Sequence, residues 1–297
     1  MIRKGAVVFC LPGTSPLSCL ITFGFDPSLN KLVGLDLNMV VAELLRHDII
    51  VRGLAHPVIF GDSGLDELGG RVPGLVRKTT DGGGVPFTAN TANFRLFGAV
   101  MVTPKNYYRL MQTGQNALLF PGGVKEVFHG KGEAYKIFWP DKVDFVRTAA
   151  RFNATIITLS SVGMADSLNI LADNREIANL PFLGQRAKEF AKNVTAARFD
   201  KTPEDEFFLP PLVAPKLPSR NYFLFGKPVS TTHIDPNDRK SCQDVYNQLQ
   251  REIENGFEDI LRAREKDPYR DYPLRVAYER WTQKQAPTFD IQELNRF

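Results

Sequence analysis

The residues best suited to chemistry lie between positions 116 and 139, in the run NALLFPGGVKEVFHGKGEAYKIFW. An apolar strand leads into Pro121-Gly122-Gly123, where two glycines permit positive φ angles and close approach of the backbone. Successive backbone N–H groups in such a turn can form a concave site for an oxyanion or a phosphate. Glu126 and His129 follow at intervals of three residues. The pattern predicts a ligand-binding turn at the carboxyl end of a strand, with a plain tight turn as the alternative.

Other familiar catalytic motifs are incomplete. The segment Gly61-Asp62-Ser63-Gly64-Leu65 has leucine where a nucleophile elbow needs glycine. The run Gly82-Gly83-Gly84 lacks the third glycine of a dinucleotide-binding loop. Glu126 and His129 have the helical spacing of a di-iron ligand pair, but the sequence offers no second copy of that pair. We therefore expect neither a serine hydrolase nor a nucleotide-binding protein, and we assign no metal ligand and no bound cofactor.

The composition is that of an ordinary globular protein, with 297 residues, 43% hydrophobic and 24% charged. It excludes collagen, a coiled coil, a disordered chain and a multispanning membrane protein. The formal charge of +4 is spread along the chain. This suits an anionic membrane surface or a phosphorylated ligand and does not point to nucleic acid. Cys10, Cys19 and Cys242 fit neither a disulfide framework nor a zinc site, so a reducing compartment is expected.

Several helices are predicted by apolar residues at helical spacing or by capping residues. Residues 36–47 carry an apolar stripe. Thr103 caps a second helix that has Pro104 at its first position. A third helix starts at Pro140. A long helix begins at Ser241 with an apolar stripe at Val245, Leu249, Ile253, Phe257, Ile260 and Leu261.

Short apolar or β-branched runs alternate with these helices and predict strands at 49–51, 58–60, 99–102, 117–120, 155–159 and 222–225. The run 222–225 is expected to be the last strand of the chain. The alternation favours an α/β fold with a mostly parallel sheet flanked by helices. Residues 61–93 are rich in glycine and predict a long surface loop.

The first thirty residues superficially resemble a signal peptide or a short membrane anchor, because residues 5–25 are uncharged and follow Arg3 and Lys4. Turn-forming residues 12–16 interrupt this stretch. Neither half approaches the roughly 20 apolar residues of a spanning helix. We therefore expect a strand–turn–strand or a poorly ordered terminus, without a convincing transit peptide.

The segments FGAVMVTPKNYYRL and NALLFPGGVKEVFHGKGEAYKIFWPDKVDFVRTAARFNATI resemble the acyltransferase half of plant phytyl ester synthases, which are related to type-2 diacylglycerol acyltransferases. The runs VRGLAHPVIF, YFLFGKPV and AREKDPYRDY continue the resemblance. It covers roughly Asn30 to Pro287. We accordingly divide the chain into a divergent N-terminal segment, 1–29, an acyltransferase-like domain, 30–287, and a tail, 288–297. The resemblance implies a fold like that of the glycerolipid acyltransferases.

The implied reaction is transfer of a fatty acyl group to phytol or diacylglycerol, with acyl-CoA, acyl carrier protein or a galactolipid as the donor. Such a reaction needs a general base, backbone donors for the developing oxyanion and an apolar trough. By resemblance, an acceptor-side motif includes Gly98, Val102 and Pro104. A second motif shapes the site with Pro121, Gly122, Gly123 and Glu126. Glu126 is a catalytic candidate, and Pro121, Gly122, Gly123 and the neighbouring His129 are substrate-binding candidates.

The resemblance fails at one catalytic position. Relatives carry a motif of the form His-x-x-x-Gly-x-[Asp/Glu]-Leu, and here the matching run is NKLVGLDL, starting at Asn30. Asparagine has no titratable nitrogen and cannot act as a base. Asp36, which in relatives would orient the histidine, is kept. Three explanations stay open: a truncated or mis-joined gene product, a catalytically impaired paralogue that binds lipid, or substitution by His56 or His129.

The implied partners are lipid substrates and a membrane or lipid-droplet surface that the protein contacts peripherally. Phe207, Phe208, Leu209 and the loop 61–93 are the surface candidates. By resemblance the protein would reside in the chloroplast, on plastoglobules. Residues 158–166 lack the Pro-Phe-Gly and Gly-Glu-Asp runs of the relatives, so the preference for an acyl donor does not carry over.

Overall fold

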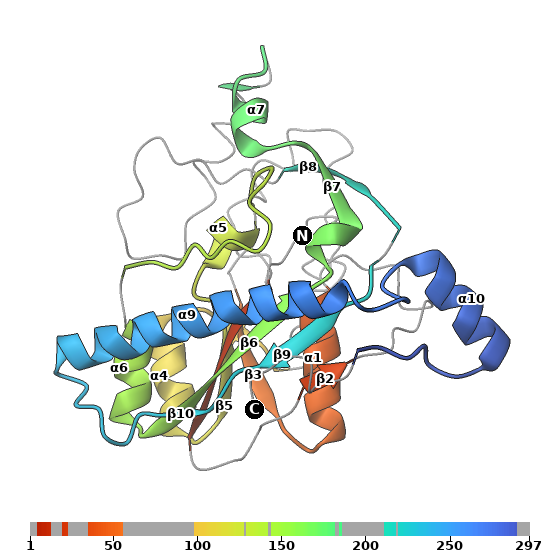
Figure 1. Ribbon diagram of the computed structural model, residues 1–297. Helices are drawn as coiled ribbons and strands as arrows, with labels where there is room; N and C mark the ends of the chain where they lie inside the picture. The colour runs from red at the N-terminus through yellow and green to blue at the C-terminus, as the bar shows by residue number, and fades with distance from the viewer. Residues whose placement is uncertain are drawn as a thin grey trace, which may run out of the picture.

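The computed structural model describes residues 5–12, 20–22, 35–55, 98–127, 129–141, 144–181, 184–185, 211–217 and 219–289. Within these residues a mixed eight-stranded sheet is covered by helices on both faces (Figure 1). The strand order is β2-β9-β6-β1-β5-β3-β4, and β10 also pairs with β6. These strands are β1 Gly5–Pro12, β2 Leu20–Thr22, β3 Val51–Ala55, β4 Val100–Met101, β5 Asn116–Leu119, β6 Ala154–Val162, β9 Tyr222–Phe225 and β10 Val229–Ser230.

The prediction of a mostly parallel sheet is wrong. Only the pairs β3–β4 and β3–β5 are parallel in the described part of the sheet. The reason is β1, which inserts between β5 and β6 and runs antiparallel to both. Because β5 and β6 each oppose β1, they run in the same direction as each other and as β3 and β4. The carboxyl ends of these four strands therefore lie at the same side of the sheet, which we call the carboxyl edge.

The two N-terminal strands agree with the strand–turn–strand expectation. β1 lies in the middle of the sheet, with Val8 opposite Leu119 of β5 and opposite Thr158 of β6. β2 pairs with β9 at the far edge. The residues between these two strands lie outside the described part of the chain.

Alternation along the strands divides the core into two layers, since successive side chains point to opposite faces. One layer packs under α1, Leu35–Arg46, through Val40, Val41, Leu44, Leu118, Ile157 and Phe223. The other packs under α4, Pro104–Gln112, α6, Asp144–Arg151, and α9, Arg239–Arg264. Figure 1 shows the long α9 crossing this second face.

The predicted helix cap is confirmed at α4 and is wrong at α9. Thr103 caps α4 as expected, and its Oγ1 accepts the N–H of Asn106 at 3.1 Å. α9 starts at Arg239, two residues before the predicted start, because Asp238 is the cap. The Asp238 carboxylate accepts the N–H groups of Lys240 and Ser241 at 3.0 and 3.3 Å. All six residues of the predicted stripe pack in the core, five of them buried and Leu261 partly buried.

The remaining elements are short. They are α5 Gly123–Val127, a 3₁₀ turn Ala165–Ser167, β7 Leu168–Ala172, α7 Asn174–Ala178, β8 Leu212–Pro215 and α10 Tyr272–Thr282. β7 and β8 form a separate two-stranded ribbon. The third predicted helix begins at Asp144 rather than at Pro140, and β10 follows the strand predicted to be the last. None of the helices in the described ranges is long and apolar enough to cross a membrane.

Candidate functional site

The candidate site is the turn after β5 and the segment that follows it. The Gly123 N–H donates to Phe120 O at 3.0 Å and closes the turn, and Gly123 has a φ of +55°. A left-handed φ of this kind favours glycine, as the sequence predicts. The Gly123 N–H is thereby used within the turn and is not available to an oxyanion.

Gly122 is required by the carboxyl group of Glu126. A Cβ at Gly122 would lie 1.9 Å from Glu126 Cδ, so the Glu126 side chain folds back across the glycine. Glu126 is 2% exposed, and its Oε1 accepts the N–H of Phe138 at 3.1 Å. This bond joins the two ends of a thirteen-residue stretch, 126–138. Glu126 and His129 near its start are buried, whereas residues 131, 132, 134 and 136 are exposed. The stretch is therefore an internally closed unit whose start is buried and whose middle faces water.

His129 lies inside the same unit and is 3% exposed. Its Nδ1 donates to Glu126 O at 3.1 Å, because a carbonyl oxygen can only accept. A proton fixed on Nδ1 leaves Nε2 as the nitrogen that can accept another. Glu126 and His129 are thus brought together, with the main chain of one orienting the ring of the other.

The segment reaches the carboxyl end of β6 through Tyr135, which has a φ of +62°. The Tyr135 hydroxyl donates to Asp166 Oδ2 at 2.7 Å and accepts the N–H of Gly163 at 3.1 Å. Arg264 of α9 forms an ion pair with the same Asp166 oxygen. Burial, and then the charge of Asp166, raise the pKa of the Tyr135 hydroxyl well above its ordinary value. The tyrosine therefore stays protonated and acts as a donor.

The end of the acceptor-side motif lies at the same edge of the sheet, since Val102 and Pro104 follow β4, whereas Gly98 precedes β4 at the other end of this strand. Gly98 has a φ of +73°, and a Cβ there would lie 1.8 Å from Nη1 of Arg52, so the arginine passes over the glycine. The Val102 N–H donates to Ala55 O at 2.8 Å and prolongs the pairing of β3 with β4. Pro104 opens α4 directly after β4. Each residue thus has a structural role, and substrate contact at Gly98, Val102 and Pro104 stays a prediction.

Asp36 is the second residue of α1. Asn221, which directly precedes β9 at the carboxyl edge, contacts Met39 of α1, with 4.0 Å between Nδ2 and Sδ. Asp36 is less than one turn before Met39, so α1 begins at the carboxyl edge. Asn30 and His56 lie outside the described residues.

Two proteins of Arabidopsis thaliana are similar to nearly the whole chain. Phytyl ester synthase 1, chloroplastic, and phytyl ester synthase 2, chloroplastic, are each 32% identical to it over 299 residues. The chain is homologous to part of these phytyl ester synthases. No family model matches the chain. No solved structure matches it either.

The matches cover 97% and 98% of this chain but only 39% of each relative. The chain thus spans about two fifths of the length of the curated relatives that it matches. A match of this extent exceeds the range 30–287, so the similarity to the phytyl ester synthases also takes in part of residues 1–29. This agrees with the central position of β1 in the sheet.

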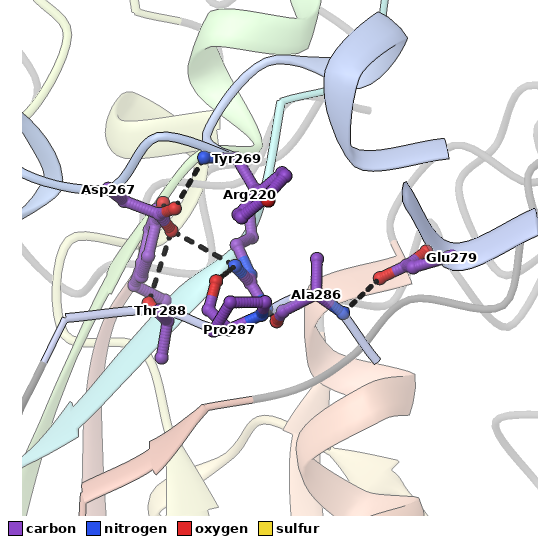
Figure 2. A network of polar contacts seen from close by, with 8 residues as sticks. Arg220, Asp267, Tyr269, Glu279, Ala286, Pro287 and Thr288 are labelled. Atoms are coloured by element: carbon purple, nitrogen blue, oxygen red, sulfur yellow. Dashed lines mark hydrogen bonds and ion pairs between the residues drawn. The ribbon is translucent and has the colours of Figure 1, made fainter. Parts of the chain in front are cut away.

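Sequence reasoning assigned no role to a second polar cluster at the carboxyl edge, which Figure 2 shows. Asp267, which is 2% exposed, accepts hydrogen bonds from Arg220 Nη1 at 3.1 Å and from the Tyr222 hydroxyl at 2.7 Å. Thr288 and the N–H of Tyr269 also donate to its carboxylate. The signal available was the resemblance of the runs YFLFGKPV and AREKDPYRDY, which contain Tyr222, Asp267 and Tyr269.

Arg220 ties this cluster to the chain beyond α10. Its Nη1 and Nη2 donate to Pro287 O at 2.8 Å and to Ala286 O at 2.6 Å. Its main-chain N–H donates to Arg270 O at 3.2 Å. The cluster is structural, because most of its donors and acceptors bond to one another, although Arg220 Nε is buried without a hydrogen-bond partner.

The described site residues suit acyl transfer chemistry only in part. A buried histidine with a defined proton position and a closed, glycine-dependent turn are present at the carboxyl edge. Among the described residues, no group of three His, Cys, Asp or Glu side chains could hold a metal ion. Direct catalysis by Glu126 stays a prediction, since its described contact is the one that closes the segment.

Proposed function

We propose that this chain is an acyltransferase module that moves a fatty acyl group to the hydroxyl of phytol or diacylglycerol. The observation that carries the proposal is the homology to phytyl ester synthases over almost the entire chain. The burial of Glu126 and His129 beside the turn supports it, because a water-insoluble acyl group requires a site protected from bulk water.

The chemistry requires a base that takes the proton of the alcohol as its oxygen attacks the acyl carbonyl. The carbon–sulfur bond of the thioester donor then breaks, and the leaving thiolate takes the proton from the base. Within the described residues, His129 is the best candidate, since it is buried beside the turn and the carbonyl of Glu126 fixes a ring proton on Nδ1, which makes Nε2 the basic nitrogen. In this proposal Glu126 positions His129, and Gly122 provides the room for the Glu126 carboxyl group. The acyl donor would be acyl-CoA or acyl carrier protein, and the site of action a plastoglobule of the chloroplast.

A second candidate function is lipid binding without turnover. Asn30 favours it, because asparagine replaces the catalytic histidine of the relatives. The two candidates share the substrates and differ in whether an ester is formed.

The test is to incubate the purified protein with acyl-CoA or acyl carrier protein, phytol and diacylglycerol, and to follow esters by mass spectrometry against heat-killed protein. His129→Gln is expected to abolish ester formation, whereas His233→Gln, at an exposed loop histidine, is the matched control and is expected to have no effect. Activity that survives in His129→Gln contradicts the assignment of the base. No product in wild type, with product gained in Asn30→His, supports the binding function.

A further inference from the structure

Helix α10 has the reverse of the usual distribution of polar and apolar side chains. Leu274 and Trp281 are seven residues apart, so they share one face of the helix, and they are 62% and 88% exposed. The opposite face carries Arg275, which is 1% exposed, and Val276, which is 9% exposed. Burial lowers the pKa of the Arg275 guanidinium. A helix that faces water would normally expose its arginine and bury its tryptophan.

The exposed face is continuous between these two residues. Ala277 is exposed, and Tyr278, half-buried, lies between Leu274 and Trp281 on the same side, with its ring 4.8 Å from that of Tyr269. Trp281 is the most exposed of the large apolar side chains in the described residues. Tryptophan prefers the boundary between lipid and water, where its ring is buried and its N–H stays hydrated.

Positive charge surrounds this face. Lys266, Arg270, Arg280 and Lys284 are all exposed, on α10 or in the segments that flank it. Among the exposed residues of 266–285, Asp271 is the acid, and it pairs with Arg270 at 3.7 Å. An apolar stripe flanked by basic side chains is typical of helices that lie in the surface of an anionic membrane.

The position of α10 connects this face to the candidate site. The Arg220 N–H donates to Arg270 O, which anchors the entrance of α10 at the carboxyl edge. Tyr222, two residues after Arg220, pairs with Val162 at the end of β6. Figure 1 shows α10 projecting at the side of the sheet, away from α4 and α6.

We propose that α10 is a lipid-docking helix, which inserts Leu274 and Trp281 into the surface of an anionic membrane and holds the carboxyl edge next to it. This inference deepens the proposed function and rests on it, because docking of α10 would aid catalysis only in an acyltransferase. A lipid surface fits better than a second copy of the chain. A single stripe on an 11-residue helix is smaller than the roughly 800 Å² per partner that a stable dimer needs.

The first test is flotation of the protein with vesicles of phosphatidylcholine and phosphatidylglycerol. The double variant Leu274→Ser/Trp281→Ser is expected to bind at least about tenfold more weakly than wild type. The matched control is Leu212→Ser/Leu217→Ser, which removes two similarly exposed leucines outside α10 and is expected to bind like wild type. Equal losses in both double variants, or none in the α10 variant, overturn the proposal. Arg280→Gln/Lys284→Gln is expected to weaken binding to the anionic vesicles only.

A second measurement reports insertion directly. The chain has two tryptophans, and Trp139 is buried, so Trp281 provides the vesicle-sensitive fluorescence. Lipids with brominated acyl chains are expected to quench this emission in wild type and not in Trp281→Phe, which keeps an apolar ring and should still float. An unquenched wild type that nevertheless floats overturns the proposal. So does Trp281-dependent dimerisation without lipid in analytical ultracentrifugation.

Ester formation from detergent-dispersed substrates separates this proposal from the proposed function. Loss of flotation in the α10 variant with unchanged ester formation supports docking as an independent property. Flotation through α10 without any ester supports docking and removes the proposed function. Ester formation by a wild-type protein that does not float removes docking alone.

Discussion

Two buried polar clusters lie at the carboxyl end of β6, and they differ in the sequence distance that they bridge. In the segment 120–139, the bonds of Gly123, His129 and Phe138 join residues three to twelve positions apart. In the Arg220–Asp267 cluster, the side-chain bonds of Arg220 and Tyr222 join residues 45 to 67 positions apart. A local network can be recognised as a motif, whereas a long-range network exists only when the fold brings its parts together.

The clusters also differ in charge. The segment 120–139 closes on a carboxyl group and main-chain groups, while the second cluster buries a full ion pair between Arg220 and Asp267 at 3.1 Å. A buried ion pair must be well satisfied, because taking charges out of water is costly. Asp267 meets this requirement with donors from Arg220, Tyr222, Tyr269 and Thr288.

The largest expected effect comes from breaking the long-range cluster. Asp267→Ala leaves Arg220 buried without its carboxylate, and we expect a loss of about 3–5 kcal/mol in the free energy of unfolding. Urea denaturation followed by circular dichroism measures it. Asp271→Ala removes an exposed pair with Arg270 and should change stability by less than about 1 kcal/mol. Similar values for the two variants would contradict the distinction between the clusters.

A smaller effect is expected in the local cluster. Gly122→Ala places a Cβ against Glu126, and overpacking of this kind costs about 1–3 kcal/mol. Gly123→Ala meets open space and pays about 1–2 kcal/mol for its left-handed backbone alone. When Glu126 is also replaced by alanine, Gly122→Ala should lower the free energy of unfolding by less than it does alone. The effect of Gly123→Ala should be the same with and without Glu126→Ala. Thermal unfolding of this double-mutant cycle decides whether the contact with Glu126 is the cause.

The smallest effect concerns the tyrosine of each cluster. Burial, followed by Asp166 for Tyr135 and Asp267 for Tyr222, raises the pKa of each hydroxyl above its ordinary value near 10. The folded state therefore holds these protons more tightly than the unfolded state. The resulting stability is fully present below about pH 10 and is lost as the pH rises beyond it.

Tyr135→Phe and Tyr222→Phe should each cost about 1 kcal/mol at neutral pH through lost hydrogen bonds. Each should also reduce the decline of stability at alkaline pH. Denaturation curves from about pH 8 to 11 provide the measurement. Tyr272→Phe, at the first residue of α10 and outside both clusters, serves as the reference. An unchanged alkaline decline in both cluster variants would place its origin elsewhere.

Much of the fold follows from the sequence, because helices and strands are encoded locally. The stripe of α9 and the cap at Thr103 were predictable from spacing and residue type. Strand direction was not, since the residues of β1 carry no signal for where in the sheet they insert. Helix α10 escaped prediction because its apolar face points away from the core, so its periodicity marks no packing surface.

The candidate site divides in the same way. Pro121, Gly122, Gly123, Glu126 and His129 could be grouped from sequence, and the structure brings them together in one closed segment. The network of Tyr135, Asp166 and Arg264 was not predicted, because its members meet only across β6 and α9. The roles of Asn30, His56, Phe207 and the loop 61–93 stay predictions, as these residues lie outside the described ranges.

The insertion of β1 has a consequence for how the protein is made. Its residues pair with partners that follow about 100–150 positions later, such as Ala117 opposite Cys10 and Ser161 opposite Gly5. At a translation rate of about 5–20 residues per second, the strand waits roughly 10–30 s for β6 to leave the ribosome. β5 is synthesised before β6, so the edge of this uncharged strand that pairs with β6 stays open longer than the other. An open strand edge can pair with another chain, so β1 is exposed to aggregation until β6 follows.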